Sequence, residues 1–209
     1  HTKIYKLKPQ KIFRQKEKPN DKGKREHTTG LAVSGGGARG FAHIGALKAL
    51  EEEGIKPNII SGVSAGSIIG VLYADGYSPE EMIEIFSSVK FSDLVEITVP
   101  RSGFFKMDGF RDLLKKILRA KQFEELQYPL VVTATDLDHG ESVSFNSGPI
   151  IDVICASCCI PVVFHPVRIQ NVHYVDGGVF RNFPVKPIRH LCETIIGINV
   201  NPLVTNQYK

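Results

Sequence analysis

Short apolar segments alternate with segments of helical periodicity along most of this chain, and this alternation limits the possible folds more than any other feature. The apolar runs predict strands that are buried on both faces, as in a largely parallel sheet covered by helices. These runs are Leu31–Val33, Ile59–Ile60, Leu130–Thr135 and Thr194–Val200. The alternation therefore predicts an α/β fold with a mostly parallel central sheet.

The helices are marked by end signals and by apolar stripes. The segment Phe41–Glu53 is followed by Gly54, a residue typical of a helix C-terminus. Ser78-Pro79-Glu80-Glu81 forms a capping box with proline at the first helical position. A later apolar stripe at helical spacing consists of Phe110, Leu113, Leu114, Ile117 and Leu118.

The stretch Val143–Val175 combines several short strand candidates with few helical signals. The candidates are Ser142–Phe145, Val167–Ile169 and Val172–Val175. Short strands in such close succession predict antiparallel additions at one edge of the sheet.

The positive charge is concentrated at the start of the chain. The formal net charge of the 209 residues is +4, but residues 1–30 contain ten Lys or Arg and three Asp or Glu, whereas residues 31–209 contain sixteen and nineteen. We therefore predict a basic, flexible tail over residues 1–30 and a folded domain over residues 31–209. A tail of this kind either binds anionic lipid or stays solvated.

Composition excludes one class of protein and indicates a compartment. No apolar run approaches the roughly 20 residues that a membrane-spanning helix needs, so the sequence is not that of an integral helical membrane protein. The four cysteines do not resemble a secreted disulfide framework, and we expect a reducing, cytoplasmic location. Cys155-x-x-Cys158 has the spacing of a metal or redox site but lacks a second pair, so we interpret both residues as small apolar core residues and predict no metal site.

The most specific motif is Gly62-x-Ser64-x-Gly66, which lies between an apolar strand and the helical run Ser67–Ala74. This strand–turn–helix context is that of a nucleophile elbow, in which a serine on a strained turn projects its hydroxyl group. Glycine on both sides removes side chains that would collide with the neighbouring strand or helix. The N-terminus of the following helix favours negative charge near the serine. We therefore interpret Ser64 as a candidate nucleophile.

A second glycine-rich loop has two interpretations. It consists of Gly35, Gly36, Gly37, Ala38, Arg39 and Gly40. The loop matches the G-x-G-x-x-G pattern of dinucleotide-binding proteins, but the next strand candidate, Ile59–Ile60, does not end in the carboxylate that would bind a ribose. Alternatively, its backbone N–H groups form an oxyanion hole, with Arg39 reinforcing that role. The presence of an elbow serine in the same chain favours the oxyanion hole.

A nucleophilic serine requires a base. The seven histidines lack an accompanying motif, although His190 would complete a triad with Ser64 and Asp176 in a chain order known for hydrolases. Asp176-Gly177-Gly178 follows a strand candidate, and its glycines allow a close approach by another backbone or a ligand. An Asp-Gly pair is also a common turn, so both interpretations of Asp176 stay open on composition.

Taken together in this order, the Gly35 loop, the Ser64 elbow and the Asp176 loop resemble the patatin-like phospholipase family. The similarity covers about residues 31–200 and includes Thr135-Asp136, Ala156-Ser157 and Ile160-Pro161. The resemblance implies a three-layer α/β/α fold and a Ser–Asp dyad without histidine. It assigns Ser64 as the nucleophile, Asp176 as the base, and Gly35 to Arg39 as the oxyanion hole.

The sequence departs from the family pattern in two places. Cys158 and Cys159 stand where small residues are expected. The chain also ends soon after its last strand candidate, so we expect helices that often follow in the family to be absent, disordered or removed.

The resemblance implies a lipid acyl hydrolase that cleaves lipid carboxylic esters through an acyl-serine and associates transiently with a membrane surface or micelle. It implies neither a cofactor nor a nucleic-acid partner, and the sequence does not indicate an oligomeric state. Two alternatives stay open: a dinucleotide-binding protein that uses the Gly35 loop, and a non-catalytic lipid-binding module attached through the basic tail.

Overall fold

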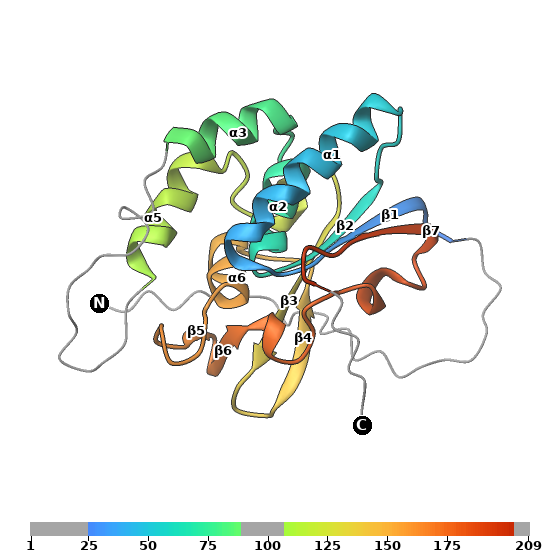
Figure 1. Ribbon diagram of the computed structural model, residues 1–209. Helices are drawn as coiled ribbons and strands as arrows, with labels where there is room; N and C mark the ends of the chain where they lie inside the picture. Colours follow the sequence, from blue (N-terminus) through green and yellow to red (C-terminus); the bar gives the residue numbers. More distant parts are fainter. Residues whose placement is uncertain (1–24, 89–106, 203–209) are drawn as a thin grey trace, which may run out of the picture.

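The computed structural model describes residues 25–88 and 107–202. Seven strands form one mixed sheet in the order β5-β6-β3-β2-β1-β7, with β4 paired to the free edge of β3 (Figure 1). The strands are β1 (His27–Val33), β2 (Ile59–Val63), β3 (Leu130–Asp136), β4 (Glu141–Phe145), β5 (Val167–Ile169), β6 (Val172–Asp176) and β7 (Cys192–Ile198). The α/β fold predicted from the alternation is confirmed.

The sheet has a parallel half and an antiparallel half. β7, β1, β2 and β3 run parallel to one another, whereas β4 and β6 pair antiparallel with β3, and β5 pairs antiparallel with β6. The parallel strands are the apolar runs singled out by composition, and the antiparallel ones come from the stretch Val143–Val175. The expected antiparallel additions at one edge are therefore confirmed.

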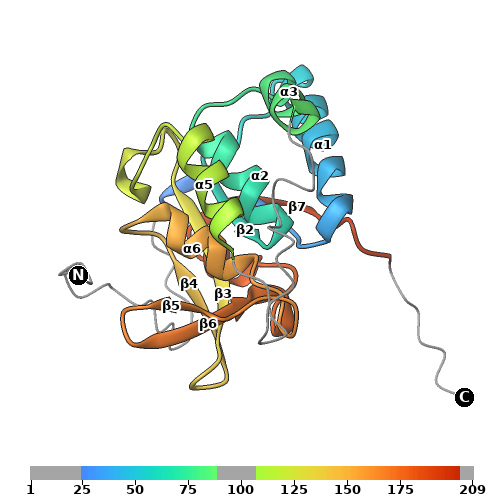
Figure 2. The ribbon, with the colours of Figure 1, turned by 90° about the vertical axis from the view of Figure 1, so that its left-hand side faces the viewer.

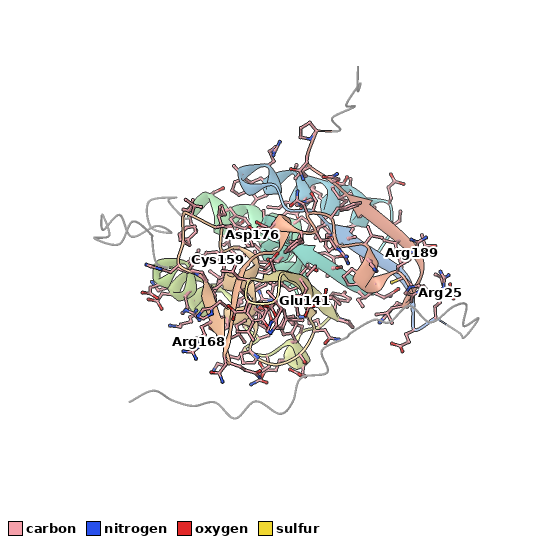
Figure 3. The ribbon with its side chains drawn as sticks, turned by 90° about the horizontal axis from the view of Figure 1, so that it is seen from below. Arg25, Glu141, Cys159, Arg168, Asp176 and Arg189 are labelled. Atoms are coloured by element: carbon pink, nitrogen blue, oxygen red, sulfur yellow. The ribbon has the colours of Figure 1, made fainter. Side chains whose placement is uncertain are left out.

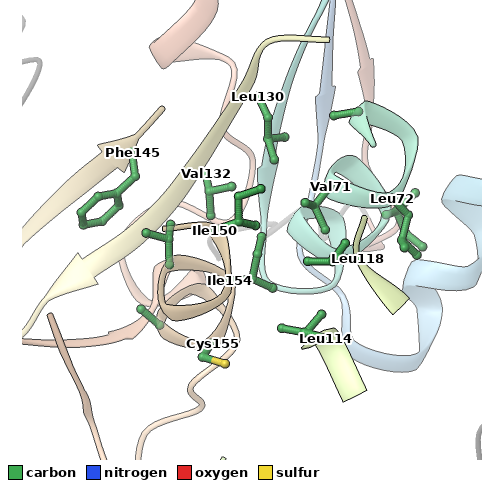
Figure 4. Close-up of a cluster of buried hydrophobic side chains, with 14 of the residues drawn as sticks. Val71, Leu72, Leu114, Leu118, Leu130, Val132, Phe145, Ile150, Ile154 and Cys155 are labelled. Atoms are coloured by element: carbon green, nitrogen blue, oxygen red, sulfur yellow. The ribbon is translucent and has the colours of Figure 1, made fainter. Parts of the chain in front are cut away.

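The α-helices of the described residues lie along one face of the sheet (Figures 1 and 2). They are α1 (Ala42–Glu52), α2 (Ala65–Ala74), α3 (Pro79–Ser88), α5 (Asp108–Ile117) and α6 (Ile150–Ser157). Four short 3₁₀ helices occur as well: η1 (Gly37–Phe41), η2 (Phe123–Glu125), η3 (Gly177–Val179) and η4 (Lys186–Ile188). The larger core cluster fills the space between these α-helices and the sheet, as Figure 4 shows for α2, α5 and α6.

The opposite face of the sheet carries a much smaller cover. Ala32, Ile59 and Val131 point to this face and pack with Ile188 of η4 and with Cys192. The expected three-layer arrangement is therefore reduced, in the described segments, to a helical layer, the sheet and one 3₁₀ helix. Neighbouring side chains of a strand point to opposite faces of the sheet, so the residues of β1 are divided between the two hydrophobic clusters.

Several helix ends match the sequence signals. Ser78 and Glu81 exchange the two capping-box hydrogen bonds at the start of α3, from Ser78 N–H to Glu81 Oε2 (2.8 Å) and from Glu81 N–H to Ser78 Oγ (3.2 Å). Gly54 follows α1 with a φ of 72°, in the left-handed region. The stripe of α5 buries Phe110 and Leu114 in the main core.

The start of β1 and the presence of helix α6 differ from the sequence-based expectation. Strand β1 begins at His27, inside the segment predicted to be a tail, because its polar first residues pair with β7 (His27 with Cys192, Thr29 with Thr194). Residues 1–24 of that tail lie outside the described residues. Helix α6 was not predicted, because its Ile, Val and Cys residues have modest helix propensity and are apolar on nearly every side.

Candidate active site

Ser64 occupies a strained turn between β2 and α2. Its φ of 51° and ψ of −127° are unfavourable for a residue with a side chain. The flanking glycines make this turn possible: a Cβ on Gly66 would lie 2.5 Å from the carbonyl oxygen of Val33, and one on Gly62 would lie 2.6 Å from the carbonyl oxygen of Gly66. The elbow is therefore a site of close backbone packing that excludes larger residues.

The register of β3 brings Asp176 to this turn. β2 ends at Val63, opposite Thr133, and β6 ends at Asp176, opposite the next residue, Ala134. Because β4 occupies the other edge of β3 over the same positions, β2 and β6 share one edge and meet end to end. The Ser64 hydroxyl donates a hydrogen bond to Asp176 Oδ2 at 2.7 Å.

The carboxylate of Asp176 is held in a nearly buried position. The residue is 8% exposed, and its Oδ1 accepts a hydrogen bond from the N–H of Gly178 at 2.7 Å. Its own N–H donates to the carbonyl oxygen of Cys159 at 2.7 Å, and the two residues lie side by side in Figure 3. Burial raises the pKa of Asp176, while the bonds from Ser64 and Gly178 oppose that shift. A raised pKa makes this carboxylate a stronger base than an exposed one.

The glycine-rich loop lies against the elbow at both of its ends. A Cβ on Gly35 would come within 3.2 Å of Ser64 Cβ, and one on Gly40 would lie 2.6 Å from Ala65 Cβ. The N–H of Gly35 already donates to the carbonyl oxygen of Asn182 (3.0 Å), and the N–H of Arg39 donates to the carbonyl oxygen of Gly36 (3.2 Å). The predicted oxyanion hole consists of the five residues from Gly35 to Arg39. These two hydrogen bonds occupy the backbone donors of its first and last residues.

The central residues of the loop retain their donors. Among the described residues, no acceptor is recorded for the N–H groups of Gly36, Gly37 and Ala38. Gly37 has a φ of 56°, in the left-handed region that favours glycine. The Arg39 guanidinium donates to Asn201 Oδ1 at 3.1 Å. The centre of the loop therefore carries backbone N–H donors without an acceptor in the described residues, whereas its two ends are anchored by hydrogen bonds.

His190 lies at the wrong end of the sheet for a triad. It precedes β7, whose first residue pairs with His27 at the start of β1, whereas Ser64 follows the last residue of the parallel strand β2. Its neighbour Arg189 is correspondingly far from Asp176 in Figure 3. The triad of Ser64, Asp176 and His190 is therefore wrong, because parallel strands separate these ends by their full length.

Three residues at the site, two through their side chains and Asn182 through its backbone carbonyl, were not predicted as functional residues. Ser157 accepts a hydrogen bond from the N–H of Ser64 (2.9 Å) and donates to the carbonyl oxygen of Thr133 (2.7 Å). Ser67 donates to the carbonyl oxygen of Ser64 (2.7 Å), and Asn182 supplies the acceptor for Gly35. Only Ser157 had a signal in the sequence, as part of Ala156-Ser157.

The described segments offer little to a metal ion or a dinucleotide. They contain no group of three or more His, Cys, Asp or Glu side chains arranged to hold a metal ion. Strand β2 runs directly into the Ser64 turn and ends without a carboxylate, so the dinucleotide interpretation lacks its ribose-binding residue. Cys155 is buried and reduced, as expected for a small apolar core residue, whereas Cys158 is reduced but only partly buried against the core. None of the helices in these segments has the length and apolar character required to cross a membrane.

Comparison with known proteins shows the family. The model of the family described as "Patatin-like phospholipase" matches residues 31–188. An uncharacterized NTE family protein of Mycobacterium tuberculosis is 32% identical over 174 residues, which are 82% of this chain and 48% of that protein. The human patatin-like phospholipase domain-containing protein 6 is 31% identical over 184 residues, which are 83% of this chain and 13% of that protein. The chain thus spans about half the length, or less, of these relatives.

A solved structure supports the same fold. The crystal structure of VipD from Legionella pneumophila superposes with a TM-score of 0.55 at 16% sequence identity and covers 81% of this chain and 49% of that one. At this identity, the likeness concerns the fold alone.

Proposed function

This chain belongs to the patatin-like phospholipase family, and we propose that it is a lipid acyl hydrolase in which Ser64 and Asp176 form the catalytic dyad. The observation that carries the proposal is the 2.7 Å hydrogen bond from the hydroxyl of Ser64, on its strained turn, to the nearly buried carboxylate of Asp176. The family supports lipid esters as the substrate class.

In the proposed acylation step, Ser64 Oγ attacks the carbonyl carbon of the ester while its proton passes to Asp176 Oδ2. The central N–H groups of the glycine-rich loop, from Gly36 to Ala38, stabilise the negative charge that develops on the carbonyl oxygen. When the C–O bond of the ester breaks, Asp176 returns the proton to the leaving alcohol oxygen. The products of this half-reaction are the free alcohol and an acyl-serine.

Deacylation repeats these steps with water. Asp176 takes a proton from the water, whose oxygen attacks the acyl carbon, and the proton then returns to Ser64 Oγ as the carboxylic acid leaves. The bond from Gly178 N–H to Oδ1 keeps Oδ2 directed at the reacting oxygen in both half-reactions. Direct proton transfer to the carboxylate needs no histidine.

A fluorophosphonate probe tests the nucleophile, because it phosphonylates an activated serine. We expect a single modified residue, Ser64, and loss of both labelling and fatty-acid release from phospholipid micelles in Ser64→Ala and Asp176→Asn. Ser88→Ala and Asp112→Asn are matched controls, since both residues are exposed and lie on α3 and α5. Full turnover in either dyad variant, or labelling at a different serine, would disprove the dyad.

A further inference from the structure

Two apolar turns begin beside the dyad. The hydrogen bond from the N–H of Asp176 to the carbonyl oxygen of Cys159 joins two points of the chain, and a surface turn follows each. The first turn, residues 160–163, comes directly after Cys159, and the second, residues 179–181, comes after Asp176 and its two glycines. Both turns therefore start at the edge of the candidate active site (Figure 3).

Apolar side chains project into solvent from both turns. The exposed fractions are 48% for Ile160, 80% for Val162, 39% for Val163, 53% for Val179 and 57% for Phe180. Single exposed apolar residues are common on protein surfaces, but five of them in two turns that start from hydrogen-bonded neighbours indicate a binding surface.

The first turn is held in shape by its own backbone and by the core. The N–H groups of Val163 and Phe164 both point to the carbonyl oxygen of Ile160, at 3.3 and 3.0 Å, and Phe164 packs against the main core. Val162 has a φ of 70°, which is rare for a β-branched residue. The turn thus presents its most exposed apolar side chain on a fixed backbone.

The charge of this part of the chain is one-sided. From residue 153 to residue 192, the only carboxylate side chain is that of Asp176, which is nearly buried, whereas the same stretch contains Arg168, Arg181, Lys186 and Arg189. Arg181 directly follows Phe180, and its guanidinium has no recorded partner among the described residues. The exposed Arg39 of the glycine-rich loop adds a second cation beside the site.

We propose that the turns 160–163 and 179–181 form the face that docks onto an anionic lipid surface, with Val162 and Phe180 entering the apolar boundary and Arg181 meeting the phosphates. This proposal rests on the proposed function, because a lipid substrate would then reach Ser64 from the surface on which the protein sits. Apolar insertion and electrostatic attraction add in interfacial binding, so the combination favours anionic over zwitterionic lipid.

Vesicle co-sedimentation of the full chain tests the surface. We expect binding to vesicles of equal parts phosphatidylcholine and phosphatidylglycerol, and much weaker binding to phosphatidylcholine alone. The double variant Val162→Ser/Phe180→Ser should lose about tenfold in binding to the anionic vesicles. Arg181→Gln should weaken anionic binding and reduce the difference between the two vesicle types. Ile55→Ser is the matched control, because Ile55 is 38% exposed but precedes β2, at the opposite end of that strand from Ser64.

Hydrolysis of the soluble ester p-nitrophenyl butyrate separates this proposal from the proposed function. The double variant should retain this activity while losing hydrolysis of vesicle phospholipid. If the wild type cleaves neither substrate, the dyad proposal fails, but the binding comparison still decides the docking surface. Equal vesicle binding by the wild type and the double variant would overturn the docking proposal. It would also be overturned if the wild type bound no vesicles but self-associated, and the double variant abolished that self-association.

Discussion

Ser157 fixes the backbone of Ser64 by hydrogen bonding. Its hydroxyl accepts a hydrogen bond from the N–H of Ser64 at 2.9 Å and donates one to the carbonyl oxygen of Thr133 at 2.7 Å. The hydroxyl is fully buried and links α6, β3 and the elbow. Because this bond uses the N–H of Ser64, that group is not available to an oxyanion. The proposed mechanism therefore assigns that role to the central donors of the glycine-rich loop.

Ser157→Ala should slow catalysis without changing substrate affinity. The variant leaves the N–H of Ser64 and the carbonyl oxygen of Thr133 without their partner, so we expect a loss of stability of about 1–3 kcal/mol. The strained turn should also lose definition, which lowers kcat while KM stays constant. Ser157→Thr retains the hydroxyl and should recover part of the kcat; an unchanged kcat in Ser157→Ala would show that the bond does not position Ser64.

Gly66→Ala and Gly45→Ala should have opposite effects on stability. A Cβ on Gly66 would lie 2.5 and 2.6 Å from the carbonyl oxygens of Val33 and Ser34, so the elbow or β1 must shift. Gly45 lies inside α1, and its added Cβ would meet no atom of the described residues within 4 Å beyond the local helix backbone, so alanine there should stabilise the protein by about 0.5–1 kcal/mol. Urea unfolding of both variants measures the difference, and a Gly66→Ala variant as stable as the wild type would contradict the packing.

The raised pKa of Asp176 should appear in both activity and stability. The base must be ionised to accept a proton, so kcat/KM should fall on the acid side with a midpoint above 3.8, the ordinary aspartate value. The folded state binds more protons than the unfolded state between the two pKa values, so Asp176 costs stability increasingly as pH rises through that window. Asp176→Asn should therefore gain stability over the wild type as the pH rises, and the two should converge at low pH. Unfolding across this range is the measurement, and a constant difference would refute the raised pKa.

His43 should make the protein sensitive to mild acid. It is fully buried, its Nε2 bonds the carbonyl oxygen of Ser34 at 2.8 Å, and its Nδ1 has no hydrogen-bond partner within residues 25–88 and 107–202. Burial lowers its pKa below 6.5, so the unfolded state binds the proton more readily and stability declines as pH falls below that value. His43→Gln removes this titration. Thermal melts from pH 7.5 to pH 5 should show a decline in the wild type that is smaller in the variant; parallel declines would assign the effect to other groups.

The amino-acid sequence by itself indicated the α/β class, the parallel core strands and the proposed nucleophile, Ser64. These features follow from local patterns: apolar runs of strand length, capping signals such as Ser78 with Glu81, and glycines at positions 62 and 66 where a Cβ has no room. Local patterns did not indicate α6, because a short helix that is apolar on nearly every side has no amphipathic stripe.

Only the tertiary structure decided which groups meet. Asp176 stands 112 residues after Ser64, and it reaches the serine because β2 and β6 end at adjacent positions on one edge of β3. The same strand register places His190 at the other end of the sheet. The choice of backbone donors in the glycine-rich loop likewise depends on Asn182, a residue from a distant segment. Strand register and long-range hydrogen bonds depend on the packing of the whole chain, so no local stretch of sequence specifies them.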